Sequence, residues 1–362
     1  MSENSQIRPG LAGVVAFETA IAEPDKDGGS LRYRGVDVEE LVGRADFGRV
    51  WGLLVDGDPS RGLPAADPLG LPIGSGESRA DVQAGLAAAG PRLGLRPLVD
   101  ADAAQARADL ARTSAAALSL AAQSARGVQP AVPEWQVQAG ATPAERFMIA
   151  WQGEPDPRHV EAVDAYWITA AEHGVNASTF TARVVASTGA DAAACLSAAV
   201  GALSGPLHGG APSRALAMVE EVERTGDARG HVRSVLDSGQ RLMGFGHAVY
   251  RAEDPRARIL REAARRLGAD RFEAAAALEE AALAELRERK PDRVLATNVE
   301  FWAAVLLDFA RIPPSLFTPL FACARTAGWS AHVLEQHALG KIIRPSAVYV
   351  GEQKVSAASL GL

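Results

Sequence analysis

The stretch FEAAAALEEAALAELRERK, residues 272–290, has the clearest helical pattern in the chain, and it indicates the fold class. Leu278, Ala282 and Leu286 recur every four residues, so they line one face of a helix. The last turn is basic, which suits the negative end of the helix dipole, and Pro291 stops the helix. Helix-like segments dominate the rest of the chain, and the sequence therefore predicts an all-α fold.

The other elements follow from similar local patterns. Residues 144–152 and 159–174 predict two further helices, the second ending at Gly174. Residues 101–127 are rich in alanine and predict either one long helix or a helix pair. Strand patterns are confined to the N-terminal part: residues 13–23, and residues 28–42, which read as a turn, a short strand and a helix. The Pro-, Gly- and Ser-rich residues 59–81 form a surface loop or a linker.

Length and composition bound the class of protein. The 362 residues predict one large domain or two ordinary ones, and 48% hydrophobic residues suffice for a sizeable core. A formal net charge of −7 argues against a nucleic acid held by bulk charge. Cys195 and Cys323 lie in apolar, helix-like contexts and are interpreted as buried thiols in a reducing compartment. With no signal peptide in view, and with the apolar run 192–203 too short to span a bilayer, we expect a cytoplasmic, non-membrane protein.

Two glycine-rich segments each hold one histidine. In GPLHGGAPSRAL, residues 205–216, His208 lies in a turn before a helix that Pro212 begins. The helix dipole disfavours a second positive charge there, so the ring is biased toward its neutral form and can donate a hydrogen bond to a developing oxyanion. In MGFGHAVYRAEDPRAR, residues 243–258, His247 precedes Arg251 and Arg256, whose guanidinium groups suit carboxylate or phosphate oxygens. A structural loop and a solvated basic face are the alternatives for these two segments.

Two later segments add charged residues in apolar surroundings. Glu300 lies just ahead of an apolar helix, flanked by Phe301 and Trp302, and burial there would raise its pKa toward that of a useful base. An ordinary carboxylate at a helix N-terminus is the alternative. Arg325 is embedded in a small-residue helix and needs an anionic partner, whereas Arg344 precedes a proline in an extended segment. No phosphate-binding glycine fingerprint, paired cysteines or Gly-x-Ser-x-Gly motif is present.

Seven signatures, in this order along the chain, make the sequence resemble the citrate synthases. They cover roughly residues 10–55 and 145–351, and the resemblance is weak across 57–140. The signatures are GLAGVVAFETAIAE with LRYRGVDVEEL (10–41), EHGVNASTFTARVVAST (172–188), GPLHGGA (205–211), MGFGHAVYRAEDPRA (243–257), NVEFW (298–302), ARTAGWSAHVLEQ (324–336) and IIRPSAVYVG (342–351).

The resemblance implies a two-domain helical fold with a few short N-terminal strands, in a homodimer. Residues 1–213 with 312–362 would form the large, dimer-forming domain, and residues 214–311 a small domain that closes over the active-site cleft. Such enzymes condense acetyl-CoA with oxaloacetate and water to give citrate and CoA. Both reactants are substrates, and neither a cofactor nor a metal is implied.

The resemblance also implies a role for each matched residue. His208 would hydrogen-bond the thioester oxygen, Glu300 would remove the methyl proton, and His247 would act as the acid on the ketone of oxaloacetate. Oxaloacetate would be bound by His173, Arg256, Arg325 and Asn298, with Arg344 supplied by the partner subunit, and CoA by Arg251, Met243, Gly244, Phe245 and Gly246.

Glu300 departs from the family pattern, which has an aspartate at this position. Its side chain is one methylene longer, so the carboxylate overshoots by about an ångström unless the backbone or rotamer adjusts, and misplacement on that scale can cost about 100-fold in rate. Three alternatives to citrate synthesis stay open: a 2-methylcitrate synthase that uses propionyl-CoA, a non-catalytic paralogue that binds CoA, and a metal-dependent hydrolase built from His173, His208, His247 and Glu300.

Overall fold

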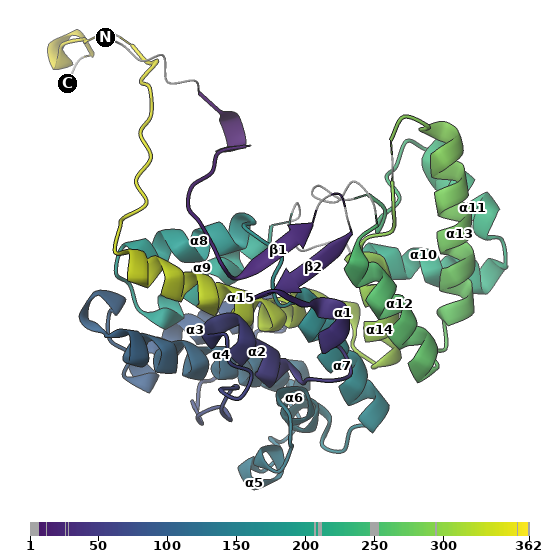
Figure 1. The fold of residues 1–362 in the computed structure, drawn as a ribbon, viewed down its shortest axis with the longest axis horizontal. Coiled ribbons are helices and arrows are strands. Elements are labelled where there is room, and N and C mark those ends of the chain that lie inside the picture. The colour runs from purple at the N-terminus through teal and green to yellow at the C-terminus, as the bar shows by residue number, and fades with distance from the viewer. Residues whose placement is uncertain are drawn as a thin grey trace.

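The computed structural model is mostly helical, which confirms the predicted fold class (Figure 1). Its described residues form fifteen α-helices and one sheet of three short strands. They are residues 7–11, 13–25, 27, 29–205, 208, 212–246, 253–293, 295–352 and 354–360, without the side chains of 212 and 213.

The small sheet is antiparallel, and its strands follow one another along the chain. The strands are β1 (Ala22–Asp25), β2 (Ser30–Tyr33) and β3 (Val36–Asp37). Tyr33 pairs with Ala22 on one side and with Val36 on the other. The predicted strand over 13–23 is wrong for its first part, because residues 14–19 adopt no regular structure and Val14 and Val15 are exposed with no neighbouring strand.

Ten helices form the body of the molecule. They are α1 (Val38–Leu41), α2 (Phe47–Asp56), α3 (Ser78–Leu93), α4 (Ala103–Arg126), α5 (Glu134–Gln138), α6 (Pro143–Gln152), α7 (Pro157–Ala170), α8 (Ala177–Ser187), α9 (Ala192–Leu203) and α15 (Phe317–Leu339). The alanine-rich stretch after residue 101 is thus a single helix, α4, which Asp102 caps by accepting a hydrogen bond from the backbone N–H of Gln105. Helix α15 runs through the centre of the body and packs against α2, α4, α7, α8 and α9.

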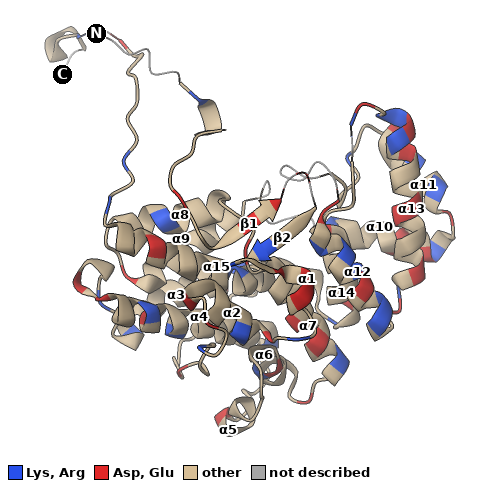
Figure 2. Cartoon of the chain, viewed as in Figure 1, with Lys and Arg blue, Asp and Glu red and all other residues tan. Residues whose placement is uncertain are grey.

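The remaining five helices lie together on one side of the body (Figure 1). They are α10 (Pro212–Thr225), α11 (Ala228–Asp237), α12 (Pro255–Leu267), α13 (Phe272–Arg289) and α14 (Val299–Phe309). Helix α13 ends just before Pro291, and Leu278, Ala282 and Leu286 are buried, as predicted. Acidic and basic residues are interspersed along α11, α12 and α13 (Figure 2).

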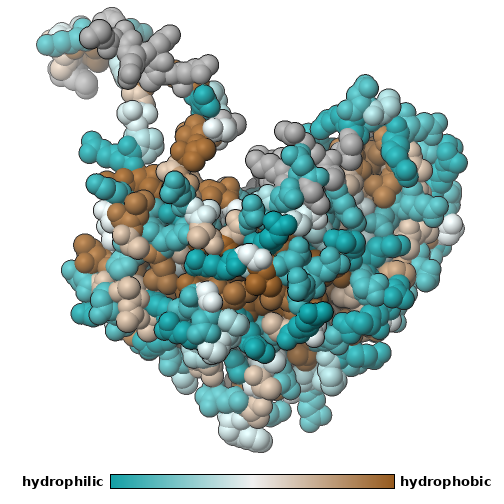
Figure 3. All heavy atoms as spheres, viewed as in Figure 1, coloured by the Kyte–Doolittle hydropathy of each residue, from teal (hydrophilic) through white to brown (hydrophobic). Residues whose placement is uncertain are grey.

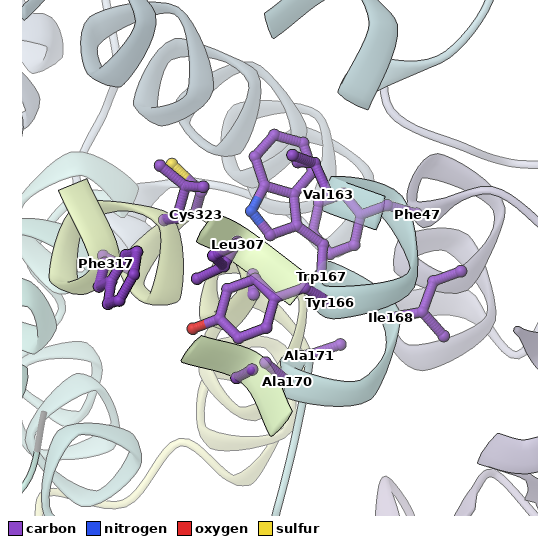
Figure 4. Close-up of a cluster of buried hydrophobic side chains, with 14 of the residues drawn as sticks. Phe47, Val163, Tyr166, Trp167, Ile168, Ala170, Ala171, Leu307, Phe317 and Cys323 are labelled. Atoms are coloured by element: carbon purple, nitrogen blue, oxygen red, sulfur yellow. The ribbon is translucent and has the colours of Figure 1, made fainter. Parts of the chain in front are cut away.

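Helix α7 joins the two groups of helices, because it packs against α15 in the body and against α12 and α14 in the side group. Figure 4 shows Tyr166 and Trp167 of α7 in one apolar cluster with Leu307 of α14 and Cys323 of α15. Both cysteines are free and buried, as predicted. Burial alone raises the pKa of the Cys323 thiol well above its usual range, so this residue is a core side chain.

Both chain ends leave the body as extended segments on the same side (Figure 1). In the space-filling view, apolar atoms gather on the N-terminal segment and where the two segments leave the body (Figure 3). The exposed apolar side chains of these segments are Ile7, Leu11, Val14, Val15, Ile342, Val348, Tyr349, Val350, Val355 and Leu360. Among the described residues, no helix has the length and apolarity needed to cross a bilayer.

Candidate active site

His208 lies beside the N-terminus of α8. Its Nε2 is 2.9 Å from Oγ of Ser178 and 3.4 Å from the backbone nitrogen of the same residue. Trp329 of α15 donates its indole N–H to this Oγ at 3.2 Å. The imidazole is thus held between α8 and α15, with the ring of Phe321 6.5 Å away, edge to face.

The surroundings of His208 favour a neutral ring. Burial and, secondly, the charge of Arg325 lower the pKa of His208 below its usual range. The backbone N–H of Ser178 can only donate, and it points toward Nε2. This contact favours the tautomer in which Nε2 accepts and Nδ1 carries the hydrogen, so that Nδ1–H is left as a donor for a ligand.

The glycine-rich residues 243–246 are joined to the start of α14. Phe245 forms an antiparallel bridge with Thr297, and the backbone N–H of Gly246 donates to the carbonyl of Ala296 at 2.7 Å. Gly244 has φ +85°, and a Cβ there would come within 2.8 Å of Cβ of Phe301, so only glycine fits without a shift. This arrangement brings two segments about fifty residues apart in the sequence side by side.

Asn298 links the same two segments through its backbone and its side chain. Its backbone N–H donates to the carbonyl of Gly244 at 2.9 Å, and its Nδ2 donates to the carbonyl of Gly246 at 2.9 Å. Its Oδ1 accepts from the backbone N–H of Glu300 at 3.0 Å and so caps α14. Asn298 therefore fixes the start of α14, in whose first turn Glu300 lies.

Asp254 and Arg256 form a buried ion pair at the N-terminus of α12. Nε and Nη2 of Arg256 lie 2.9 Å from Oδ1 and Oδ2 of Asp254, which is a bidentate arrangement. Asp254 also caps α12 and accepts from the backbone N–H of Val299 at 2.9 Å. One carboxylate thus orients Arg256 and holds α12 against the start of α14.

Glu300 is largely buried beside this ion pair. Burial raises its pKa to about 7, although Arg256 acts in the opposite direction and Asp254 adds to the rise. A carboxyl group with this pKa is half ionised near neutral pH, which suits a general base. The charge of Glu300 also contributes to the raised pKa of Tyr166, so the two side chains lie close enough to interact.

Arg325 of α15 is buried, with 3% of the residue exposed. Its Nε donates to the carbonyl of Ala170 at 2.6 Å, and its guanidinium lies 4.8 Å above the ring of Phe321. Its Nη1 has no hydrogen-bond partner among the described residues. Burial lowers the pKa of Arg325, and Glu172 acts in the opposite direction, so the guanidinium sits in a site that favours an added anion.

His173 lies in the short turn between α7 and α8. Helix α7 ends at Ala170 and not at Gly174 as predicted, and the hydroxyl of Tyr33 lies at this end, where it accepts from the backbone N–H of Glu172 at 3.2 Å and has one hydrogen to donate to the nearby carbonyls. That oxygen is 3.0 Å from the carbonyl oxygen of Ile168 and 3.1 Å from that of Glu172. The side chain of Glu172 in turn accepts from the backbone N–H of His173 at 2.8 Å.

The charge of Arg325 acts on the pKa of His208, and the charge of Arg256 acts on the pKa values of both Arg325 and Glu300. These couplings place the four predicted residues in one buried region. Arg344 is separate, because it is exposed in the C-terminal segment. His247 and Arg251 lie outside the described residues, so their predicted roles stay predictions. The described residues contain no group of three or more His, Cys, Asp or Glu side chains that could hold a metal ion.

Comparison with known proteins decides the family. The family model described as citrate synthase, C-terminal domain, matches residues 10–346, which is most of the chain. The chain belongs to the citrate synthase family. A relative in Mycobacterium tuberculosis, named "Putative citrate synthase 2", is 67% identical over 345 residues and covers 95% of this chain and 92% of its own.

Two further family members are informative, one because it is named for a different activity and one because its structure holds two ligands. A 2-methylcitrate synthase of Shewanella oneidensis is 36% identical, with 94% of each chain covered. The citrate synthase of Thermoplasma acidophilum, solved as a ternary complex with carboxymethyl coenzyme A and oxaloacetate, superimposes with a TM-score of 0.81 at 26% identity. That alignment covers 98% of this chain and 99% of the other.

Three residues that contact the candidate site were not singled out from the sequence. They are Tyr33, which contacts Glu172, Glu172, which contacts His173 and lies near His332, and Ser178, which contacts His208. Ser178 carried one usable signal, since it follows Asn176 in an N-cap pattern that places its backbone N–H at a helix end. Nothing in the local sequence around Tyr33 indicates its contact with the end of α7.

Proposed function

We propose that this member of the citrate synthase family condenses acetyl-CoA with oxaloacetate and releases citrate and CoA. The observation that carries the proposal is the buried group of His208, Glu300, Arg256 and Arg325, which combines a neutral hydrogen-bond donor, a carboxyl group with pKa about 7 and two guanidinium groups. Enolisation of a thioester needs a positioned base together with a donor at the oxygen, and a dicarboxylate needs arginines.

The proposed reaction has three steps. Glu300 accepts a proton from the methyl group of acetyl-CoA, while Nδ1–H of His208 donates to the thioester oxygen. The methylene carbon of the enol attacks the ketone carbon of oxaloacetate, and His247 protonates the ketone oxygen. Water then cleaves the thioester of citryl-CoA, giving citrate and CoA.

Substrate binding is divided among the matched residues. His173, Arg256, Arg325 and Asn298 take oxaloacetate, and Arg251 with residues 243–246 takes CoA. Closure of residues 214–311 over the cleft would exclude water until both substrates are bound. No metal or cofactor takes part in these steps.

We propose a homodimer in which Arg344 completes the oxaloacetate site of the partner subunit. Two observations support this arrangement: Arg344 is exposed in an extended segment, and both terminal segments expose a series of large apolar side chains. Exposed apolar surface of this extent is typical of an interaction site, and a second copy of the chain is its proposed occupant.

A second candidate is 2-methylcitrate synthesis from propionyl-CoA. It is favoured by the 36% identity to a relative of that name, and it uses the same catalytic groups with a different pocket around the acyl chain. Release of CoA from each acyl-CoA in the presence of oxaloacetate tests both proposals. A higher kcat/KM with acetyl-CoA supports the first proposal, a higher value with propionyl-CoA supports the second, and no release with either rejects both.

A further inference from the structure

Glu172 is a fully buried carboxylate next to the residues proposed to bind oxaloacetate. Its Oε1 accepts from the backbone N–H of His173, whereas its Oε2 has no hydrogen-bond partner among the described residues. Its charge acts on the neighbouring guanidinium of Arg325, whose Nη1 also lacks a described partner. Buried polar atoms without partners are rare in folded proteins and call for an explanation.

His332 of α15 lies on the other side of this carboxylate and is equally buried. Its Nε2 is 3.6 Å from Oε1 of Glu172, an ion-pair distance at which this nitrogen has no hydrogen-bond partner among the described residues, and its Nδ1 is 3.0 Å from Nη1 of Arg183. Because a guanidinium can only donate, Nδ1 must accept, and a neutral ring then carries its hydrogen on Nε2. The positive edge of the imidazole therefore faces Glu172.

Arg183 of α8 is itself fixed in place, so the tautomer of His332 does not depend on a mobile group. Its Nη1 lies 2.9 Å from Oε2 of Glu335, and its Nε donates to Oε1 of Gln336 at 3.2 Å. Phe17 of the N-terminal segment covers its guanidinium at 3.6 Å. Phe17 of the N-terminal segment thus contacts Arg183, Arg183 contacts His332, and His332 lies beside Glu172.

Gly328 makes the place of the carboxylate possible. A Cβ at residue 328 would lie 1.9 Å from Oε2 of Glu172, so the missing side chain on α15 forms the space that Glu172 occupies. The backbone N–H of Gly328 also donates to the carbonyl of Ala171, which holds α15 close to the turn before His173. A carboxylate accommodated in this way has a defined position.

We propose that Glu172 and His332 are positioning residues for the oxaloacetate site. The inference rests on the proposed function, since it assigns oxaloacetate to His173 and Arg325. His332 orients the carboxylate of Glu172, which holds the backbone of His173 through Oε1 and faces Arg325 until the substrate supplies its own carboxylates. Neither residue takes part in proton transfer, so their loss should affect oxaloacetate binding more than turnover.

The test compares steady-state constants and direct oxaloacetate binding, measured by calorimetry, for wild type and variants. His332→Phe keeps a ring and removes both nitrogens, and we expect it to raise the KM and Kd for oxaloacetate about tenfold, the effect of one lost polar contact. We expect kcat and the KM for the acyl-CoA to stay within about threefold of wild type. His332→Gln keeps a donor near Nε2 and should restore most of the oxaloacetate affinity.

Ser330→Ala is the matched control. Ser330 is buried on the same helix, and its hydroxyl lies 3.1 Å from that of Ser114 in the body, so its loss should leave the oxaloacetate constants unchanged. Should His332→Phe not fold, Glu172→Asp applies the same test, because it keeps the charge but withdraws the carboxylate from His173 and His332. We expect the same rise in the oxaloacetate KM and Kd.

The inference is overturned if the folded variants bind oxaloacetate as wild type does, or if kcat and both KM values worsen together. Failure of the proposed function gives a different result, since wild type itself would then release no CoA with either acyl-CoA. If wild type binds oxaloacetate but does not turn over, the calorimetric comparison alone decides the positioning role. If wild type does not bind oxaloacetate, the inference is rejected together with the proposed function.

Discussion

Glu300 is the residue whose chemistry depends most on its surroundings. Its pKa of about 7 arises from burial at the start of α14 and is moderated by Arg256. If Glu300 is the base, kcat/KM for acetyl-CoA should rise with pH through about 7, because only the ionised carboxylate accepts a proton. Glu300→Gln should lower the rate by at least about 100-fold and remove this rise. A Gln variant that exchanges the methyl protons of acetyl-CoA in deuterated water as fast as wild type would exclude Glu300 as the base.

The same pKa predicts an effect on stability. A carboxyl group with a raised folded-state pKa stabilises the fold below its unfolded pKa, and that contribution is lost as pH rises through about 7. Glu300→Gln removes the cost of burying the charge, so it should be stabilising by up to about 3 kcal/mol at pH 8 and nearly neutral at pH 4.5. Urea unfolding of both proteins at each pH and at one protein concentration measures the difference. An equal difference at the two pH values would contradict the assigned pKa.

Arg325 has a buried guanidinium with an unpartnered Nη1 among the described residues. Arg325→Ala should weaken oxaloacetate binding by about 2–5 kcal/mol, the usual cost of removing one member of a desolvated charge pair, and acetyl-CoA binding by much less. Calorimetric titration with each ligand measures this. Arg224→Ala, at an exposed ion pair on α10, is the control and should change neither affinity. Equal weakening toward both ligands would assign Arg325 a structural role.

At the scale of elements, Tyr33 of β2 controls where α7 ends. Its hydroxyl accepts from the backbone N–H of Glu172 and donates its one hydrogen among three carbonyl oxygens within 3.3 Å, so Tyr33→Phe leaves a buried donor and a buried acceptor without this partner. We expect the free energy of unfolding to fall by about 1–3 kcal/mol in urea titrations. Tyr349→Phe is the control, because the hydroxyl of Tyr349 contacts only exposed chain in the same segment. A Tyr33→Phe variant as stable as wild type would show that the end of α7 does not need this hydroxyl.

The elements that the sequence predicted best are those whose signals are local. The repeat of Leu278, Ala282 and Leu286 with the proline behind it defined α13, because helix periodicity and helix stops act within a few residues. The end of α7 was misplaced because it depends on Tyr33, more than 130 residues away. The strand expected at 13–23 formed only in its last part, since a strand needs a partner that local sequence does not reveal.

The same distinction between local signals and long-range contacts applies to the residues of the candidate site. The glycine-rich turns, Glu300 and Arg325 were recognisable because each is an unusual residue for its local context. Ser178, Glu172 and Tyr33 were not, because their contacts with His208, His332 and α7 join residues far apart in the sequence. The ion pair of Asp254 and Arg256 was not predicted, although the cap of α12 that accompanies it acts over only two residues.

At the scale of the whole molecule, the exposed apolar terminal segments and Arg344 lead to a test of the shared site. Two variants, Glu300→Gln and Arg344→Ala, should each be nearly inactive as homodimers. In a mixed dimer, one site combines Glu300 of one subunit with Arg344 of the other and is intact. Unfolding and refolding an equal mixture should therefore restore roughly a quarter of wild-type activity, because half of the dimers carry one intact site of two. A mixture as inactive as the separate variants, with mixed dimers detected by mass spectrometry, would contradict an exchanged Arg344.

The space that Gly328 leaves for Glu172 has an evolutionary consequence. Because a methyl group at 328 would overlap the carboxylate, position 328 cannot drift freely. The same methyl carbon would also lie 2.7 Å from the backbone carbonyl oxygen of Ala171, so a shorter acid at 172 would not by itself release position 328 from glycine. Homologous chains should therefore keep glycine at position 328 even where the acid at 172 has been replaced, whereas position 172 is free to change opposite that glycine.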